Sequence, residues 1–204
     1  IQGVLRIHER RHAPGLLAVG DDREADRGLA AALRTVDLDH AAAGQAADAQ
    51  QAWALLGWAK SHGDFGTTMG AGTDIHHLRP TDVQINGLRG NLDFDYGGSA
   101  VSGCDGCLRT STSWEPPNEV KGDVARMLFY MAVRYEPGDP VDLELNNMLN
   151  NGTAPYHGKL SVLLEWHAQD PVSAWERQRN EKIEDFQGNR NPFIDHPEWA
   201  ESIW

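Results

Sequence analysis

The chain has 204 residues and a formal net charge of −12 at pH 7. That length can bury one sizeable hydrophobic core, so we expect a single domain over residues 1–204. The acidic excess excludes a protein that coats nucleic acid through bulk charge, but it is compatible with an enzyme that has a local basic groove. No apolar run approaches the length of a membrane span, and no signal peptide with a basic start and an apolar centre is visible. We therefore expect no membrane partner.

Residues 1–57 differ in composition from the rest of the chain. Ala, Arg, Gly, Asp, Leu and Gln dominate there, whereas Asn, Ser, Lys, Tyr, Phe, Met and Cys are absent. Because Ala and Leu favour helix, two segments are predicted to be helical, near residues 23–35 and residues 41–56.

A Gly-rich loop over residues 58–72 leads to TDIHHLRPTD at residues 73–82, which holds two adjacent imidazoles, two carboxylates and an arginine. Imidazole and carboxylate groups bind divalent metals and move protons near neutral pH. Downstream, Asn86, Arg89 and Asn91 can hydrogen-bond phosphate. This mix indicates phosphodiester chemistry, although a polar loop with a structural histidine can have the same sequence.

Residues 74–86 are predicted to form a strand end and a short helix, and residues 90–113 a loop. Two cysteines, Cys104 and Cys107, stand in that loop as CDGC. A zinc site would need partners that this spacing does not supply, and a redox motif should open a helix after a strand. We favour a disulfide that closes the loop in an exported protein, with free thiols as the alternative.

The clearest predicted helix follows Pro117, where Asn118 can cap it and apolar residues recur at helical spacing. This apolar stripe consists of Val120, Val124, Leu128, Ala132 and Tyr135. We expect the stripe to lie in the core and the helix to stop before Pro137.

Three further helical segments are predicted, at residues 143–150, 159–168 and 172–186. The last two are separated by Gln-Asp-Pro. Asp170 should cap the last helix, with Pro171 at its first position.

Polar residues near the C-terminus indicate specific contacts. Arg177 and Asn180 lie one turn apart on the last of these segments and can share a face. The run QGNRNP at residues 187–192 is expected to form a hydrogen-bonded turn. A short helix with Asp195 as N-cap should follow it.

Three separated motifs resemble one family. WAKSHGDFG at residues 58–66, the run at residues 73–82, and QGNRNPFIDHPEWAESIW at residues 187–204 together resemble the bacterial endonuclease I family. Its members are secreted or periplasmic, metal-dependent nucleases of the His-Me finger (ββα-metal) group. The resemblance covers residues 58–204, whereas residues 1–57 do not match.

The resemblance implies an α+β fold, mainly helical, with a small ββα-metal core. It implies cleavage of DNA, and of RNA as a further substrate, through backbone contacts without base readout. The implied cofactor is a divalent metal, with Mg²⁺ preferred over Ca²⁺ or Mn²⁺, and the implied location is secreted or periplasmic. We expect a monomer.

The resemblance also implies roles for single residues. It places a metal ligand at His77, with His76 as its structural neighbour, and Arg79 or Arg89 could contact the phosphate bidentately. The residues expected to bind nucleic acid are Lys60, His62, Arg79, Arg89, Arg177, Asn180 and Arg190.

The sequence departs from the family at Leu55 and Leu56, which stand where the family has a Glu-His pair. In the family that histidine is the general base that activates water and the glutamate is a metal ligand, and leucine can do neither. Three explanations stay open. They are a corrupted or chimeric reading frame over residues 1–57, an inactive relative, and a relocated base, for which His76, His40, His8 and His12 are candidates.

Two classes of function therefore compete, a metal-dependent nuclease and a catalytically dead, nuclease-like protein that binds nucleic acid or another partner. The Leu55-Leu56 pair, set against the intact His77, is the feature that separates them. A thiol oxidoreductase built on CDGC would need a thiol pair of depressed pKa. A metalloprotease would need a His-Glu-x-x-His helix, which the sequence lacks.

Overall fold

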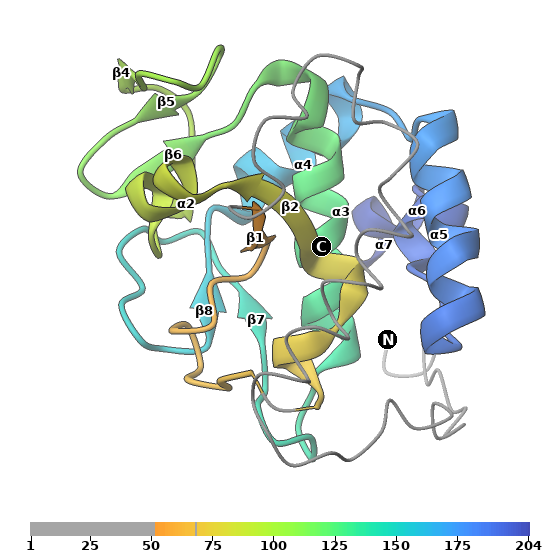
Figure 1. Cartoon of the computed structure of the whole chain (residues 1–204). Coiled ribbons are helices and arrows are strands. Elements are labelled where there is room, and N and C mark those ends of the chain that lie inside the picture. Colours follow the sequence, from red (N-terminus) through yellow and green to blue (C-terminus); the bar gives the residue numbers. More distant parts are fainter. Residues whose placement is uncertain (1–51, 68) are drawn as a thin grey trace.

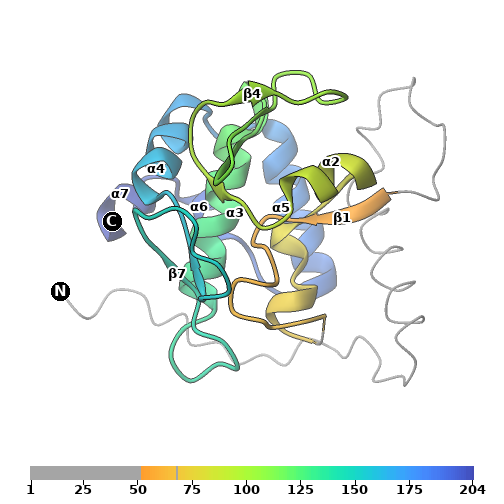
Figure 2. The same ribbon diagram turned by 90° about the vertical axis from the view of Figure 1, so that its left-hand side faces the viewer.

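The structure is a computed structural model that describes residues 52–67 and 69–204. The predicted helix at residues 23–35 and the candidate bases His8, His12 and His40 lie outside the described residues. Helices and short strands are mixed along the chain, which confirms the predicted α+β class. In both views the helix α3 (Lys121–Arg134) runs through the middle of the molecule. Figure 2 shows α4 (Leu160–Gln169) and α7 (Trp199–Ile203) on one side of it, with α2 (Val83–Arg89) and β1 (Ala52–Leu56) on the other.

Helix α3 lies at the centre of the hydrophobic core. Leu128, Phe129 and Met131 are fully buried, and α4 (Leu160–Gln169) packs along α3. Burying so many apolar side chains is the main stabilising contribution that a helix can make to a domain of this size. Both predicted helices are confirmed.

The start of α3 differs from the prediction. A 3-10 turn over Asn118–Val120 precedes the helix, and Asn118 does not cap it. Its side-chain oxygen instead accepts a hydrogen bond from the Lys121 ammonium group at 2.8 Å.

Two strands and a helix form a ββα unit at the surface (Figure 1). Strand β1 (Ala52–Leu56) pairs antiparallel with β2 (Leu78–Asp82), and α2 (Val83–Arg89) follows directly and contacts both strands. Asp82 caps α2, because its carboxylate accepts from the backbone N–H groups of Gln84 (2.8 Å) and Ile85 (3.1 Å). The expected order of elements is present.

The prediction of a helix over residues 41–56 is wrong at its end, since residues 52–56 are a strand. The backbone ladder that β2 offers outweighs the local helix preference of this Ala-rich and Leu-rich segment. The remainder of the segment lies outside the described residues.

Residues 90–113, predicted to be loop, contain short strands. The sheet order is β3-β6-β5-β4, and β3 is parallel to β6. The strands are β3 (Asp93–Phe94), β4 (Ser99–Ala100), β5 (Leu108–Arg109) and β6 (Ser113–Glu115). Strands of two or three residues carry too little pattern to be found in a sequence. The turn between β4 and β5 holds the Cys104–Cys107 disulfide, with Cα atoms 5.4 Å apart.

The predicted helix at residues 143–150 is also wrong. Residues Glu144–Leu145 form β7, which pairs in parallel with β8 (Tyr156–His157). The asparagines that follow bond to the chain locally, and Asn146 accepts from the backbone N–H of Met148 at 3.0 Å. Such side-chain bonds compete with helix formation.

The last helices are α5 (Ala174–Gln187), α6 (Pro192–Asp195) and α7 (Trp199–Ile203). Helix α5 starts with a capping box of Ser173 and Glu176, so Asp170 is not its cap. Asn191 caps α6, and Asp195, the predicted cap of a later helix, instead ends α6. Among the described residues no helix is long and apolar enough to cross a membrane.

Candidate active site

The end of β1 is fixed at Gly57. Its N–H donates to the His77 carbonyl oxygen at 2.7 Å, and its own carbonyl accepts from the Arg89 guanidinium at 2.8 Å. A Cβ atom at this position would lie 3.2 Å from the His77 carbonyl oxygen, so the close approach favours glycine. Positions 55 and 56, where the sequence analysis places the missing Glu-His pair, directly precede this fixed point.

The two adjacent histidines of the TDIHH run point inward. His76 is 1% and His77 0% exposed. Burial lowers the pKa of both rings to about 4, against the opposing attraction of Asp74, so both are neutral at pH 7. Nε2 of His77 donates to the Ala71 carbonyl (2.8 Å), and Nε2 of His76 to the Asn189 carbonyl (3.2 Å).

This hydrogen bonding leaves Nδ1 of each ring as the nitrogen that carries a lone pair. Neither Nδ1 has a hydrogen-bond partner among the described residues. A neutral imidazole with a bare lone pair is the form that binds a metal. His77 therefore has the right protonation state for the predicted ligand role, but its buried ring has no surface toward solvent.

Asp74 anchors the same run to the core. One carboxylate oxygen accepts from the hydroxyls of Tyr130 (2.7 Å) and Tyr135 (2.8 Å), and the other from the Gln187 amide (2.9 Å) and the His76 backbone N–H (2.9 Å). Burial alone would raise the pKa of Asp74, but His76 and the bond from Gln187 hold it below its usual range. Because both oxygens are engaged by protein donors, this carboxylate is a structural anchor.

Two of the predicted nucleic-acid contacts lie near the ββα unit with part of their surface accessible. Lys60 is exposed in the loop after β1. Arg79 on β2 pairs with Asp123 (2.9 Å), and its guanidinium carbon lies 4.1 Å from the centre of the Trp175 ring. These contacts hold the Arg79 side chain in one orientation.

Three other predicted contacts, His62, Arg89 and Asn180, are buried. Burial removes the solvent-facing surface that a direct phosphate contact requires, so in this conformation their roles are structural. Asn180, for example, donates to the Asn191 carbonyl (3.2 Å) and accepts from the Asn191 N–H (2.8 Å).

The last two predicted contacts bind groups of the protein itself. Arg177 is exposed and donates to the Val172 carbonyl at 2.9 Å. It does not share a face with the buried Asn180. Arg190 donates to both oxygens of Asp195 (2.7 Å each) and to Glu184 (2.8 Å), so its charge is already compensated.

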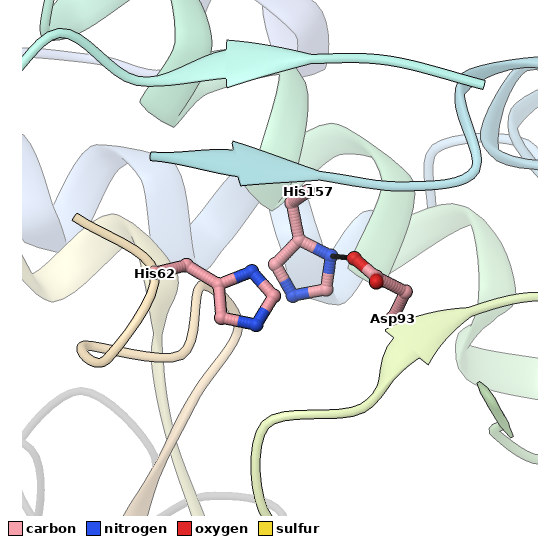
Figure 3. A group of neighbouring side chains, drawn as sticks. All are labelled: His62, Asp93 and His157. Carbon is pink, nitrogen blue, oxygen red and sulfur yellow. Dashed lines mark ion pairs between the residues drawn. The ribbon is translucent and has the colours of Figure 1, made fainter. Parts of the chain in front are cut away.

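Figure 3 shows a buried group of His62, Asp93 and His157, in which His157 lies between the other two side chains. Ligand atoms of the three lie within 4.8 Å of one another, the spacing of a metal site. However, the ring nitrogens of His62 lie 2.6 Å from the Tyr156 carbonyl and 2.9 Å from the Asn91 carbonyl. His62 therefore has no nitrogen free for a metal.

The other two members of the group are engaged as well. Nδ1 of His157 lies 3.2 Å from Asp93, and its Nε2 lies 3.2 Å from the Arg89 guanidinium. Burial lowers the pKa of His157 to about 4, and Arg89 contributes to that shift. A metal ion would have to replace these bonds beside a buried cation, so the residues do not fit a metal.

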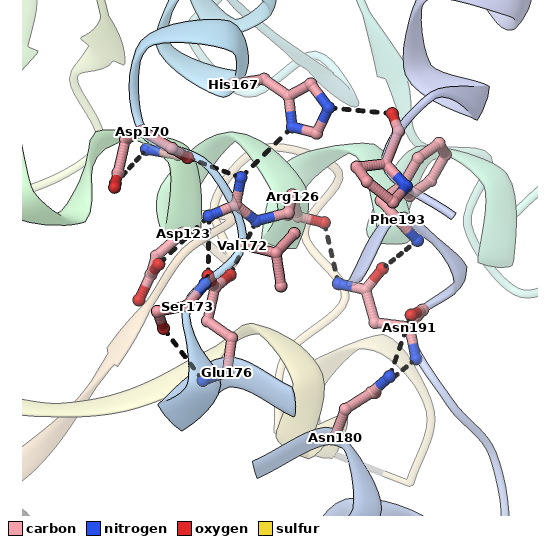
Figure 4. A network of polar contacts seen from close by, with 12 residues as sticks. Asp123, Arg126, His167, Asp170, Val172, Ser173, Glu176, Asn180, Asn191 and Phe193 are labelled. Atoms are coloured by element: carbon pink, nitrogen blue, oxygen red, sulfur yellow. Dashed lines mark hydrogen bonds and ion pairs between the residues drawn. The ribbon is translucent and has the colours of Figure 1, made fainter. Parts of the chain in front are cut away.

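Figure 4 shows the polar network that joins α3 to the C-terminal helices. The Arg126 guanidinium, fully buried, donates to both oxygens of Glu176 at 2.7 and 2.8 Å. Asn191, from the QGNRNP run, donates to the Arg126 carbonyl at 3.0 Å. Residues 188–191 thus form the predicted hydrogen-bonded turn, whereas Gln187 belongs to α5 and Pro192 to α6.

Several residues that shape the site had no local signal in the sequence. Arg179 donates to the carbonyls of Ile75 (2.8 Å) and Leu78 (2.7 Å), and so holds the chain on both sides of the adjacent histidines. Asp93 and His157 are 64 positions apart and meet only through the fold. Ser173 and Glu176 do have a local pattern, because the S-x-x-E spacing of a capping box is typical of a helix start.

Together the fold and the site define an α+β protein with a surface ββα unit whose first strand ends at a fixed glycine. The family model for endonuclease I matches residues 39–198, and the chain belongs to the endonuclease I family.

Individual relatives agree with this family. The chain is 68% identical over 149 residues to the extracellular ribonuclease of Bacillus amyloliquefaciens, covering 72% of this chain and 52% of the relative. It is 67% identical, with the same coverage, to that of Bacillus subtilis (strain 168). An extracellular deoxyribonuclease of Aeromonas hydrophila is 31% identical over 127 residues, 60% of this chain and 49% of the relative. The chain spans about half the length of these curated relatives.

Proposed function

We propose that this chain has the fold and the substrate-binding surface of a nuclease that hydrolyses phosphodiester bonds of DNA or RNA. The observation that carries the proposal is the family match over a structure in which β1, β2 and α2 form a surface ββα unit. Relatives named as ribonuclease and as deoxyribonuclease support both substrates. We further propose that the leucines at positions 55 and 56 limit catalysis by this chain.

Recognition would use the nucleic-acid backbone. Lys60 lies in the loop after β1 and Arg79 lies on β2, and phosphate contacts of this kind fix a nucleic-acid strand in place without reading its sequence. The net charge of −12 opposes the approach of a polyanion outside this local region. Binding should therefore be weak, sensitive to salt and independent of sequence.

The residues present do not complete a site for Mg²⁺, Ca²⁺ or Mn²⁺. These ions prefer oxygen ligands, and Leu55 has none to offer at the position where the family has a glutamate. The bare Nδ1 of His77 could supply one nitrogen, but that atom is buried. The divalent cation therefore belongs to the proposed family chemistry, and Leu55 leaves its site incomplete in this chain.

Hydrolysis also needs a group that takes a proton from water. Leu56 cannot do so. His76, the alternative base within the described residues, has a bare Nδ1, but that atom is buried and its ring is only 1% exposed, so it has no surface toward water. A neutral histidine at position 56 would have the required chemistry.

The leucine pair also favours a second candidate, a nuclease-derived protein that binds nucleic acid without cutting it. Beside positions 55 and 56, the contacts of Gly57 with His77 and Arg89 hold the end of β1 in place. For either function we propose a secreted or periplasmic protein that acts as a monomer, in line with relatives named extracellular or periplasmic.

A plasmid assay tests the proposal. Supercoiled DNA is incubated with the purified protein and with its Leu55→Glu/Leu56→His variant, in Mg²⁺, Ca²⁺ or Mn²⁺. We expect the variant to nick the plasmid much faster than the unchanged chain. If both proteins bind labelled oligonucleotides but neither cuts in any ion, the binding-protein candidate is favoured. If neither binds, both candidates fail.

A further inference from the structure

Arg89 joins the end of α2 to the end of β1. It is the last residue of α2, is 2% exposed, and donates to the Gly57 carbonyl at 2.8 Å. Its guanidinium carbon lies 4.9 Å from the centre of the Phe94 ring. Arg89 is therefore enclosed by the protein and makes its contacts within it.

A second contact, with His157, also holds the Arg89 side chain in place. The guanidinium lies 3.2 Å from Nε2 of His157, whose Nδ1 lies 3.2 Å from Asp93. Since arginine can only donate, Nε2 must be the unprotonated nitrogen, and Nδ1–H then faces the carboxylate. The donor and acceptor roles agree along the whole series.

Asp93 is itself held by further donors. It accepts from the Asn151 backbone N–H (3.1 Å), from the Asn151 side chain (3.0 Å) and from the Gly158 N–H (2.8 Å). A carboxylate with this many donors cannot rotate freely. The series Asp93–His157–Arg89–Gly57, named here the Arg89 brace, runs from the body of the protein to the end of β1.

We propose that Arg89 is a positioning residue for the proposed phosphodiester hydrolysis, acting through the Gly57 carbonyl to set the place and direction of positions 55 and 56. The inference rests on the proposed function. It also assigns Asp93 and His157 as support for a backbone position instead of as metal ligands. Arg89 touches neither the substrate nor the reacting atoms in this role.

The brace uses arginine because the two N–H groups of one nitrogen, Nη2, lie in the guanidinium plane and serve two acceptors at once. Lysine keeps the charge, but its freely rotating ammonium does not hold two N–H groups in these fixed directions. Methionine removes the charge and both donors while keeping much of the apolar stem. Arg134 provides a matched control, since it too ends a helix, α3, but is 47% exposed and makes a long 3.9 Å ion pair with Asp139.

The first arm of the test measures amide hydrogen exchange by NMR in the unchanged chain and in its Arg89→Lys, Arg89→Met and Arg134→Met variants. We expect the Gly57 amide to exchange about tenfold faster or more in both Arg89 variants, while amides of α3 and α4 keep their protection. Arg134→Met should leave the Gly57 amide unchanged. Equal exchange at Gly57 in all four proteins would overturn the brace.

The second arm measures cleavage with the same substitutions placed in the Leu55→Glu/Leu56→His protein. We expect Arg89→Met to lower kcat roughly 100-fold with little change in KM, because the substrate still binds but the reacting groups are misplaced. Arg89→Lys should recover part of that loss. An equal kcat for Arg89→Met and Arg134→Met contradicts the inference, whereas no cleavage even with Arg89 intact contradicts the proposed function.

Discussion

At the scale of single residues, burial decides what the TDIHH run does. A run of imidazole and carboxylate groups suggests a metal site, but here the Asp74 carboxylate accepts from two tyrosine hydroxyls, an amide and a backbone N–H. A carboxylate satisfied by four protein donors has little to offer a metal ion. Its contacts join the approach to β2 with α3 and with the last residue of α5.

Replacing this carboxylate should therefore be costly for stability. In Asp74→Asn an amide N–H₂ takes the place of one oxygen and faces donors, so we expect a loss of about 3 kcal/mol in the free energy of unfolding. Urea unfolding followed by circular dichroism measures it. Asp105→Asn, at an exposed position in the turn between β4 and β5, should change that free energy by no more than about 0.5 kcal/mol. Equal losses in the two variants would contradict the anchoring role.

The sequence could identify chemically rich residues but could not say which way they point. His76 and His77 stand out in the sequence as an adjacent pair, yet their surroundings include Tyr130, whose ring centre lies 4.4 Å from that of His76, and Arg179, and both are distant in sequence. Arg89 was expected to meet phosphate and instead bonds to Gly57. Charge and residue type are local properties, whereas exposure is set by the complete fold.

At the scale of elements, the sequence predicted a helix that has a local apolar pattern, but it did not predict the short strands that depend on long-range pairing. The apolar stripe of α3 repeats every three to four residues and could be recognised directly. By contrast, β3 pairs with β6 and β7 with β8 across intervening loops, and each has only two or three residues. Nothing within such a short strand distinguishes it from a loop.

Two glycines in helices test how closely these elements pack. A Cβ atom at Gly122, on α3, would collide with the Asp170 carbonyl oxygen after α4, whereas a Cβ at Gly87, on α2, meets nothing within 4 Å. We expect Gly122→Ala to lower the free energy of unfolding by about 2 kcal/mol. Gly87→Ala should raise it by about 0.5 kcal/mol, because alanine favours helix. Thermal unfolding of the pair measures both, and a stabilising Gly122→Ala would contradict the close contact.

At the scale of the whole molecule, three buried neutral histidines make stability depend on pH. The pKa values of His76, His77 and His157 are each lowered to about 4 by burial, from a usual value of 6.5. The unfolded chain therefore takes up protons on these rings between pH 6.5 and 4, while the folded protein does not. Their contribution to stability is complete above pH 6.5 and is lost as the pH falls toward 4.

We expect the free energy of unfolding to drop by about 2 kcal/mol per histidine between pH 7 and pH 5. Urea unfolding at half-unit steps of pH measures the slope. His196→Gln, which removes an exposed ring, should leave the slope almost unchanged. If the free energy of unfolding were constant between pH 7 and pH 5, the three rings could not all be buried in their neutral form.

The central claim is that a nuclease scaffold surrounds positions 55 and 56 and that the leucines there limit its chemistry. The most direct measurement is the rate of plasmid nicking by the unchanged chain and by its Leu55→Glu, Leu56→His and doubly substituted variants, in Mg²⁺ and again with a chelator. We expect cleavage by the double variant, little by either single variant, and none with the chelator. A double variant that folds and binds DNA but cuts no faster than the unchanged chain would contradict the claim.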